Sequence, residues 1–230
     1  MWVADKLVYR GEDDFVRAYW GDELVWYKKL PGNMLIYTSV SGQVVVPYRD
    51  GRGFEGDDYT YAFGSRVVSN TYKDGYGFLV CESDITKVDY AFPNKSDLLT
   101  VVMPDGVTNI GLCAFEWCTN LTSVVIPEGV QVIGQSAFYG CSSLSSVEIP
   151  STVSAIRWMA FWGCSILSEV ILDAVVPPDI LDPLSPEPSS VDWPFKDCAA
   201  DLVIKVPAGS VQAYRTANIW SNYASQIVAQ

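Results

Sequence analysis

The chain has 230 residues, of which 49% are hydrophobic, and a formal net charge of −12. The length fits one long domain or a repeat domain with appendages, and the apolar content suffices for a large core. The negative charge argues against binding to nucleic acid or to an anionic membrane surface, because basic patches mediate both. No apolar run approaches the roughly 18–20 residues that a membrane span requires.

Residues 1–29 are predicted to form a small N-terminal β-meander. Strands are expected at Lys6–Tyr9, Phe15–Trp20 and Glu23–Tyr27, and the pair Gly21-Asp22 suits a tight hairpin turn. These hairpins are rich in large aromatic residues, more than three strands can bury alone. We therefore expect them to pack on the rest of the chain or to meet a partner.

Residues 30–84 are predicted to be a β-rich region that leads into the rest of the chain. Two strands joined by a turn are expected within Met34–Val46, a long polar loop over 47–63, and irregular structure over 64–84. The loop contains four acidic residues, which are Asp50, Glu55, Asp57 and Asp58. Their spacing does not fit a known calcium-binding loop, so solvation is the simpler explanation.

From residue 85 to residue 172 the sequence repeats with a fixed step. The prolines Pro104, Pro127 and Pro150 are separated by 127 − 104 = 23 and 150 − 127 = 23 residues. The same step separates the members of three further sets: Phe115, Phe138 and Phe161; Cys118, Cys141 and Cys164; Leu98, Leu121, Leu144 and Leu167. A period of roughly 20–29 residues is typical of leucine-rich repeats. Ala91-Phe92 indicates a first, degenerate coil.

Each coil has an apolar face that it cannot bury alone. In the coil that begins at Leu121, Val124 and Ile126 lie on one face of a short strand. Pro127 ends this strand, because proline has no N–H to donate to the ladder. Stacked coils bury a continuous core, so neighbouring coils stabilise one another. The repeat therefore predicts a solenoid.

The pattern L-x-x-V-x-I-P-x-x-V-x-x-I-G-x-x-A-F-x-x-C-x-x over residues 85–172 resembles the BspA-type leucine-rich repeats of Bacteroides-like bacterial surface proteins. The resemblance implies a leucine-rich repeat solenoid of the α/β horseshoe class, β-rich and built from 23-residue coils. It also implies a protein that is adhesive or of unknown function, with no shared active site. Arg157 stands where the pattern has glycine, so we expect a different backbone there.

The repeat breaks after Leu172. Residues 173–194 hold six prolines, a density that forbids a helix and a central strand alike. This segment is predicted to be either an ordered wrap or a flexible insertion.

Residues 195–230 are predicted to cap the solenoid. Phe195 and Cys198 have the spacing of the repeated phenylalanine and cysteine of the coils, and Leu202–Pro207 is expected to be a last strand. Ser210 is expected to cap a helix that runs to about Asn218, with Tyr214 facing inward. The predicted architecture is thus a solenoid between an N-terminal β-hairpin region and a C-terminal capping strand and helix.

The chemistry of the chain argues against catalysis. It has no histidine, which excludes Ser–His and Cys–His nucleophiles and the usual zinc sites, and it has no glycine-rich phosphate loop. Paired carboxylates remain as the one catalytic possibility, but the acidic residues fall mainly in turns. Cysteines at one repeated core position are predicted to be buried free thiols rather than disulfides. We expect a protein that is not an enzyme and binds no cofactor or metal.

Four aromatic residues are the candidate binding site. Alignment of the coils places Trp117, Tyr139, Trp158 and Trp162 close together on one edge of the solenoid. Flat aromatic side chains there would stack on a sugar or anchor a protein. The alternative is that they shield the turns or pack against the proline-rich segment.

Two functions remain open. The first is a non-enzymatic adhesion module of a bacterial surface or secreted protein, which recognises a protein or glycan through the solenoid surface. The second is a structural or attachment module of a phage or another assembly, docked through the N-terminal hairpins. The resemblance favours the first. The chain starts without a secretory signal, which favours the second, and a place in a virion or the cytoplasm, unless a signal was trimmed before Met1.

Overall fold

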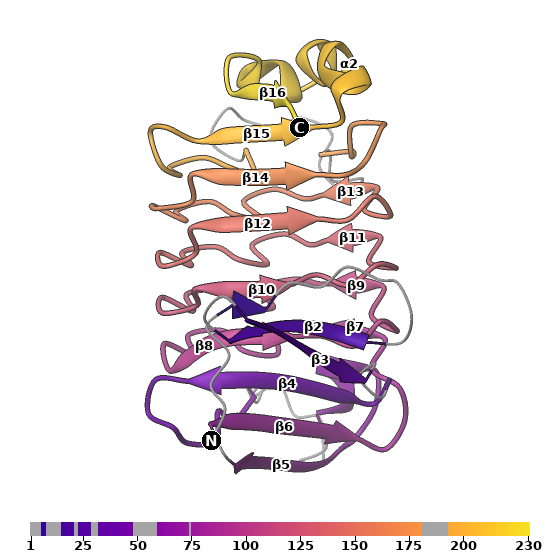
Figure 1. Cartoon of the computed structure of the whole chain (residues 1–230), viewed down its shortest axis with the longest axis vertical. Helices are drawn as coiled ribbons and strands as arrows, with labels where there is room; N and C mark the ends of the chain where they lie inside the picture. Colours follow the sequence, from indigo (N-terminus) through magenta and orange to yellow (C-terminus); the bar gives the residue numbers. More distant parts are fainter. Residues whose placement is uncertain are drawn as a thin grey trace.

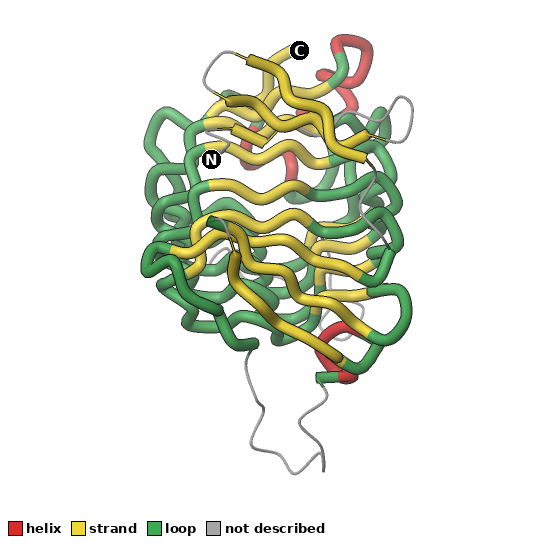
Figure 2. Tube along the Cα trace, turned by 60° about the horizontal axis from the view of Figure 1, so that its bottom comes forward, coloured by secondary structure: helices red, strands yellow, loops and turns green. Residues whose placement is uncertain are grey.

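The computed structural model describes residues 6–7, 15–20, 23–28, 32–47, 59–73, 75–180 and 193–230. The chain forms a β-solenoid of about six turns, each of about 23 residues. The turns stack along the long axis of the molecule, and the C-terminal helix lies at one end (Figure 1). Strands occupy two walls, loops connect them on both sides, and helices are confined to short segments (Figure 2).

One wall carries the longer strands, in two sheets. The first sheet has the order β10-β8-β4-β6-β5 and consists of β4 (Met34–Ser39), β5 (Val67–Lys73), β6 (Tyr76–Cys81), β8 (Leu98–Val102) and β10 (Ser123–Val125). The second has the order β12-β14-β15-β16 and consists of β12 (Ser146–Ile149), β14 (Glu169–Leu172), β15 (Val203–Val206) and β16 (Ile227–Ala229). Strands of successive coils pair in parallel. Because β10 and β12 belong to different sheets, this wall is interrupted between them (Figure 1).

The other wall is one parallel sheet of two-residue strands. Its order is β13-β11-β9-β7, formed by β7 (Lys87–Val88), β9 (Asn109–Ile110), β11 (Val132–Ile133) and β13 (Ala155–Ile156). Asp179 extends the sheet through an isolated parallel bridge to Ala155. The start of the proline-rich segment is therefore ordered and lies at the edge of this wall, while residues 181–192 lie outside the described residues.

Arg157, at the end of β13, keeps the backbone of the other coils. Its N–H donates to Ile133 O at 2.8 Å, as Gly134 N–H donates to Ile110 O at 2.6 Å one coil earlier. Its φ is not positive, so the expected change of backbone is wrong. The position needs no left-handed conformation, and the Arg157 side chain instead forms an ion pair with Asp179 at 3.6 Å.

A column of stacked phenylalanine rings forms the centre of the core. Consecutive ring centroids are 5.8, 5.3, 5.0 and 5.4 Å apart and the ring planes cross at 12° or less, along the series Phe92, Phe115, Phe138, Phe161 and Phe195. All five side chains are buried. The column confirms the 23-residue coil and shows that Phe195 resumes it after the proline-rich segment.

The cysteines form a second column beside the rings. Each of four thiols donates a hydrogen bond to the carbonyl oxygen of a phenylalanine in the preceding coil, at 3.0 to 3.3 Å: Cys118 to Phe92, Cys141 to Phe115, Cys164 to Phe138 and Cys198 to Phe161. All six cysteines are free, and only Cys198 is not fully buried. The predicted buried free thiols are thus confirmed, and cysteine serves here as a small apolar residue with a weak donor.

The region before the repeats differs from the sequence prediction. Residues 67–81, predicted to be irregular, form the antiparallel hairpin of β5 and β6. Residues 43–46, predicted to be a strand, are irregular because side chains bind their backbone: Val45 N–H donates to Tyr37 Oη at 3.1 Å, and Asn70 Nδ2 donates to Val45 O at 3.0 Å. The predicted loop contains a short helix, α1 (Thr60–Phe63). The four acidic residues considered for calcium lie outside the described residues.

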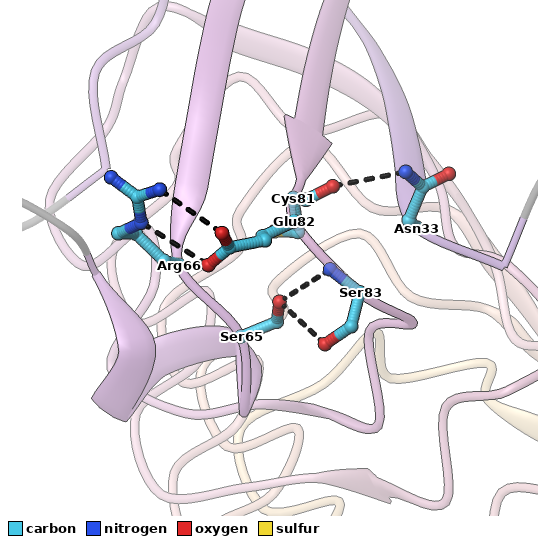
Figure 3. Close-up of polar contacts among 6 residues, drawn as sticks. All are labelled: Asn33, Ser65, Arg66, Cys81, Glu82 and Ser83. Carbon is cyan, nitrogen blue, oxygen red and sulfur yellow. Dashed lines mark hydrogen bonds and ion pairs between the residues drawn. The ribbon is translucent and has the colours of Figure 1, made fainter.

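Polar contacts fix the open end of this hairpin (Figure 3). Asn33 Nδ2 donates to Cys81 O at 2.9 Å, and Ser83 N–H donates to Ser65 Oγ at 2.9 Å. The Arg66 guanidinium pairs with the Glu82 carboxylate at 3.1 Å. Both charged side chains are largely exposed, so the pair contributes little to stability, and the amide and hydroxyl contacts set the geometry.

The C-terminal segment covers the last coil. It contains the 3₁₀ helices η1 (Ala208–Ser210) and η2 (Trp220–Tyr223) and the helix α2 (Val211–Thr216). The helix is shorter than predicted, and the Ser210 side chain makes no capping hydrogen bond. Tyr214 faces inward as predicted, and its hydroxyl donates to Ala174 O at 2.9 Å.

The N-terminal strands form a sheet of their own. β1 (Lys6–Leu7), β2 (Phe15–Trp20) and β3 (Glu23–Lys28) pair antiparallel in sequence order, as expected for a meander. No helix among the described residues combines the length and apolar character needed to cross a bilayer.

Candidate functional site

Three aromatic side chains from successive coils form a continuous row, which we call the aromatic row: Trp117, Tyr139 and Trp162. The ring centroids of Trp117 and Tyr139 are 5.1 Å apart with planes at 86°, and those of Tyr139 and Trp162 are 5.5 Å apart with planes at 89°. Edge-to-face pairs of this kind are a favourable arrangement of aromatic rings. The structure thus brings together three of the four residues of the predicted patch.

The row takes its position from the stacked core. Tyr139 and Trp162 each follow a phenylalanine of the column directly, and the turns that carry them are joined by backbone hydrogen bonds. Trp117 N–H donates to Tyr139 O at 2.7 Å, and Gly140 N–H donates to Trp162 O at 2.8 Å. Because each turn is tied to the next, the spacing of the coils fixes the spacing of the rings.

Trp117 has an unusual backbone for a large residue. Its φ is +56°, in the left-handed region, while glycine occupies the same position in the next two coils, with φ of +71° at Gly140 and +73° at Gly163. This conformation costs an L-residue about 1–2 kcal/mol. The side chain is also 45% exposed, so burial compensates for this cost only in part.

Gly140 leaves the space that the Trp117 indole fills. A Cβ atom at Gly140 would lie 2.6 Å from Cε3 of Trp117 and 2.9 Å from its Cδ2. The indole therefore lies directly against the backbone of the next coil, and any side chain at residue 140 would displace it.

Trp162 is held by the coil that follows it. Its Nε1–H donates to the Asp197 carboxylate at 2.7 Å, and the Lys196 ammonium lies 5.1 Å from the centroid of its ring, within range of a cation–π interaction. Sequence reasoning missed both partners. The proline-rich segment lengthens the step between equivalent residues from 23 to 196 − 162 = 34, which hides the register.

Trp158 does not join the row. Its half-buried side chain packs against the hydrophobic core, and its buried Nε1 has no hydrogen-bond partner among the described residues. The predicted patch therefore loses this member. Coil alignment places Trp158 at the position of Leu112 and Gln135, but a side chain as large as indole reaches inward from there and covers the core.

The thiols near the row are poor nucleophiles. Burial, together with the neighbouring Glu116 carboxylate, raises the pKa of Cys113 to about 12. At neutral pH its thiol is therefore protonated, and the thiolate is the reactive form. The described residues also contain no group of three acidic or cysteine side chains placed to hold a metal ion. The arrangement is suited to contact a ligand rather than to transform one.

The stacked coils, the two strand walls and the phenylalanine column define a solenoid protein of the leucine-rich repeat class. Residues 86–176 match the BspA type leucine rich repeat region, in six copies. The match confirms, for this region, the resemblance of its coils to BspA-type leucine-rich repeats. No curated protein matches the sequence significantly.

Proposed function

We propose that this chain is a non-enzymatic binding module of a bacterial surface or secreted protein, and that it contacts a protein or glycan through the aromatic row. The observation that carries the proposal is Trp117, a large exposed side chain on a left-handed backbone where the next two coils have glycine. The family supports the coarser part of the proposal, since its repeats are typically non-enzymatic scaffolds of surface proteins.

Trp117 has the features of a contact residue. The other coils have asparagine, glycine or aspartate at this left-handed turn position, so the turn itself does not account for a tryptophan there. Exposed tryptophan and tyrosine side chains are enriched among the residues that contribute most to binding energy. Tyr139 contacts the Trp117 ring edge-to-face and the Gly140 backbone lies against it, while 45% of the side chain stays exposed to a partner.

A binding screen with matched variants tests the proposal. Wild type, Trp117→Ala and Tyr61→Ala are screened against immobilised glycans and extracellular matrix proteins. Tyr61 is the matched control, because it is an aromatic side chain of similar exposure, 44%, in the short helix α1, outside the aromatic row. We expect at least tenfold weaker binding for Trp117→Ala and no change for Tyr61→Ala. A ligand that Trp117→Ala binds as tightly as wild type would contradict the proposal.

The N-terminal strands support a second candidate function, a structural or attachment module of a phage or other assembly. They form a sheet separate from the solenoid sheets, as an independent docking element would. This function predicts that no variant binds any glycan or matrix protein in the screen, and that the 5′ end of the gene lacks a signal sequence. Either a ligand lost on Trp117→Ala or a signal sequence upstream would favour the first function instead.

A further inference from the structure

We infer that the ligand of the aromatic row is a protein segment with an arginine or lysine side chain that lies on the exposed indole of Trp117. The inference rests on the proposed function, because it names the chemical class of the partner at the same site. Ring geometry, the contacts of Trp162 and the charge of the chain each support it.

The geometry of the row does not suit a chain of sugars. Consecutive sugar rings stack on aromatic faces that point the same way, whereas consecutive rings here cross at 86° and 89°. Trp162 is also engaged by Lys196 and Tyr139. The row therefore offers a single open indole, that of Trp117, rather than an extended flat platform.

The molecule already contains the contact that we infer for the ligand. Lys196 Nζ lies 5.1 Å from the ring centroid of Trp162, and Lys87 Nζ lies 4.7 Å from that of Tyr61. Within the described part of the chain, no cation occupies the equivalent place over Trp117. Indole is the aromatic ring that attracts a cation most strongly. Trp117 can therefore form with a partner the cation–π contact that Trp162 forms with Lys196 of its own chain.

The charge of the chain favours a cationic partner. The net charge is −12, and Glu116 places a carboxylate on the residue next to Trp117. An acidic surface attracts positively charged partners and raises their rate of association. A segment with arginine or lysine would gain both this attraction and a face-on contact with the indole.

Gly140 is the positioning residue of this contact. A methyl group at Gly140 would meet the Trp117 ring at 2.6 Å, whereas a methyl group at Gly163 would meet nothing closer than 3.8 Å. The two glycines have nearly the same φ, +71° and +73°, so alanine introduces the same backbone strain at both. Gly140→Ala displaces the indole, and Gly163→Ala is its matched control.

The test is a titration of the full chain with two synthetic probes, followed through the ¹⁵N-labelled indole N–H signals. One probe is a glycine-serine nonapeptide with three arginines, and the other has citrulline, which is neutral, in place of arginine. We expect the arginine peptide to shift the Trp117 signal, which Trp117→Leu identifies. We expect its Kd to rise about two- to fivefold in Trp117→Leu and Gly140→Ala and to stay unchanged in Gly163→Ala. The citrulline peptide should bind more weakly than the arginine peptide.

Three outcomes would overturn the inference. Equal affinity of wild type and Trp117→Leu for the arginine peptide would mean general charge attraction, and equal affinity for both peptides would exclude a role for the cation. An oligosaccharide that shifts the Trp117 signal while the arginine peptide does not would make the ligand a glycan. That last result would leave the proposed function standing. The proposed function itself would be contradicted if the screen found no ligand whose binding is lost in Trp117→Ala.

Discussion

A single ring in the phenylalanine column holds three coils together. Phe138 stacks on Phe115 at 5.3 Å and on Phe161 at 5.0 Å, and it is fully buried. We expect Phe138→Ala to lower the free energy of unfolding by about 3–5 kcal/mol, as for other buried phenylalanines. Phe138→Asp should unfold the repeats, because it buries an unpaired charge. Urea unfolding followed by circular dichroism measures both. A folded Phe138→Asp variant with unchanged stability would contradict the role of the phenylalanine column in the core.

Trp117 should be nearly neutral for stability, in contrast to Phe138. Asn94 occupies the same position one coil earlier with φ of +60°, and asparagine tolerates the left-handed region better than tryptophan. Relief of strain in Trp117→Asn should therefore offset most of the lost ring contacts. We expect a change of less than about 1 kcal/mol in the free energy of unfolding. A loss as large as that of Phe138→Ala would show that Trp117 is a structural residue.

At the scale of residues, the repeat predicts which side chains are buried in the core, but it does not predict all the contacts of the side chains at the surface. Phe138 and Cys141 recur at fixed positions, so their burial follows from the pattern alone. The direction of the Trp158 side chain does not, because a large ring at a boundary position can turn toward the core or toward solvent. The contacts of Trp162 with Lys196 and Asp197 cross the one place where the 23-residue step fails.

The C-terminal cap depends on one tryptophan. Trp220 is buried, its Nε1–H donates to Pro178 O at 2.7 Å, and its ring lies 5.1 Å from that of Tyr214. We expect Trp220→Ala to destabilise the protein by about 3–5 kcal/mol and to expose β16 to hydrogen exchange. Trp220→Phe, which keeps an aromatic ring but loses the hydrogen bond, should cost less. Equal loss in both variants would mean that the hydrogen bond, not the ring, holds the cap.

At the scale of elements, local patterns failed where pairing is long-range. Residues 67–81 lack the repeat, and their hairpin becomes a sheet only through β4, which also pairs with β8. Gln43–Val46 has an apolar strand-like sequence, but β4 is already paired on both sides. Residues 43–46 therefore cannot pair with β4, and Tyr37 and Asn70 bind their backbone instead.

For the whole molecule, the buried thiols predict a loss of stability at alkaline pH. Burial raises the pKa of all six cysteines, to about 11 for Cys81 and about 12 for Cys118 and Cys198. Above pH 9 the unfolded chain releases thiol protons that the folded chain keeps, so the free energy of unfolding falls as pH rises. Each thiol contributes up to about 1.4 kcal/mol per pH unit in this range.

Urea unfolding between pH 7 and pH 11 under reducing conditions measures this effect. Below about pH 8.5 the thiols are protonated in both the folded and the unfolded state, so we expect their contribution to the free energy of unfolding to be constant. Above pH 9 we expect the free energy of unfolding to decline steeply. Cys141→Ala, which removes one fully buried thiol, should decline less steeply, although it starts from lower stability. A flat profile from pH 9 to pH 10.5 would contradict the burial of the cysteine column.

The interruption between β10 and β12 has a mechanical consequence. On the opposite wall β11 and β13 remain hydrogen-bonded across the same coil boundary, and the turn that carries the aromatic row is tied there as well. A stack that is hydrogen-bonded along two sides and only packed along the third bends most easily about its hydrogen-bonded sides. Tyr139 and Trp162 lie in the hydrogen-bonded turn, one on each side of this coil boundary. Bending of the solenoid under load would therefore open the strand wall while the spacing of these two rings stays nearly constant.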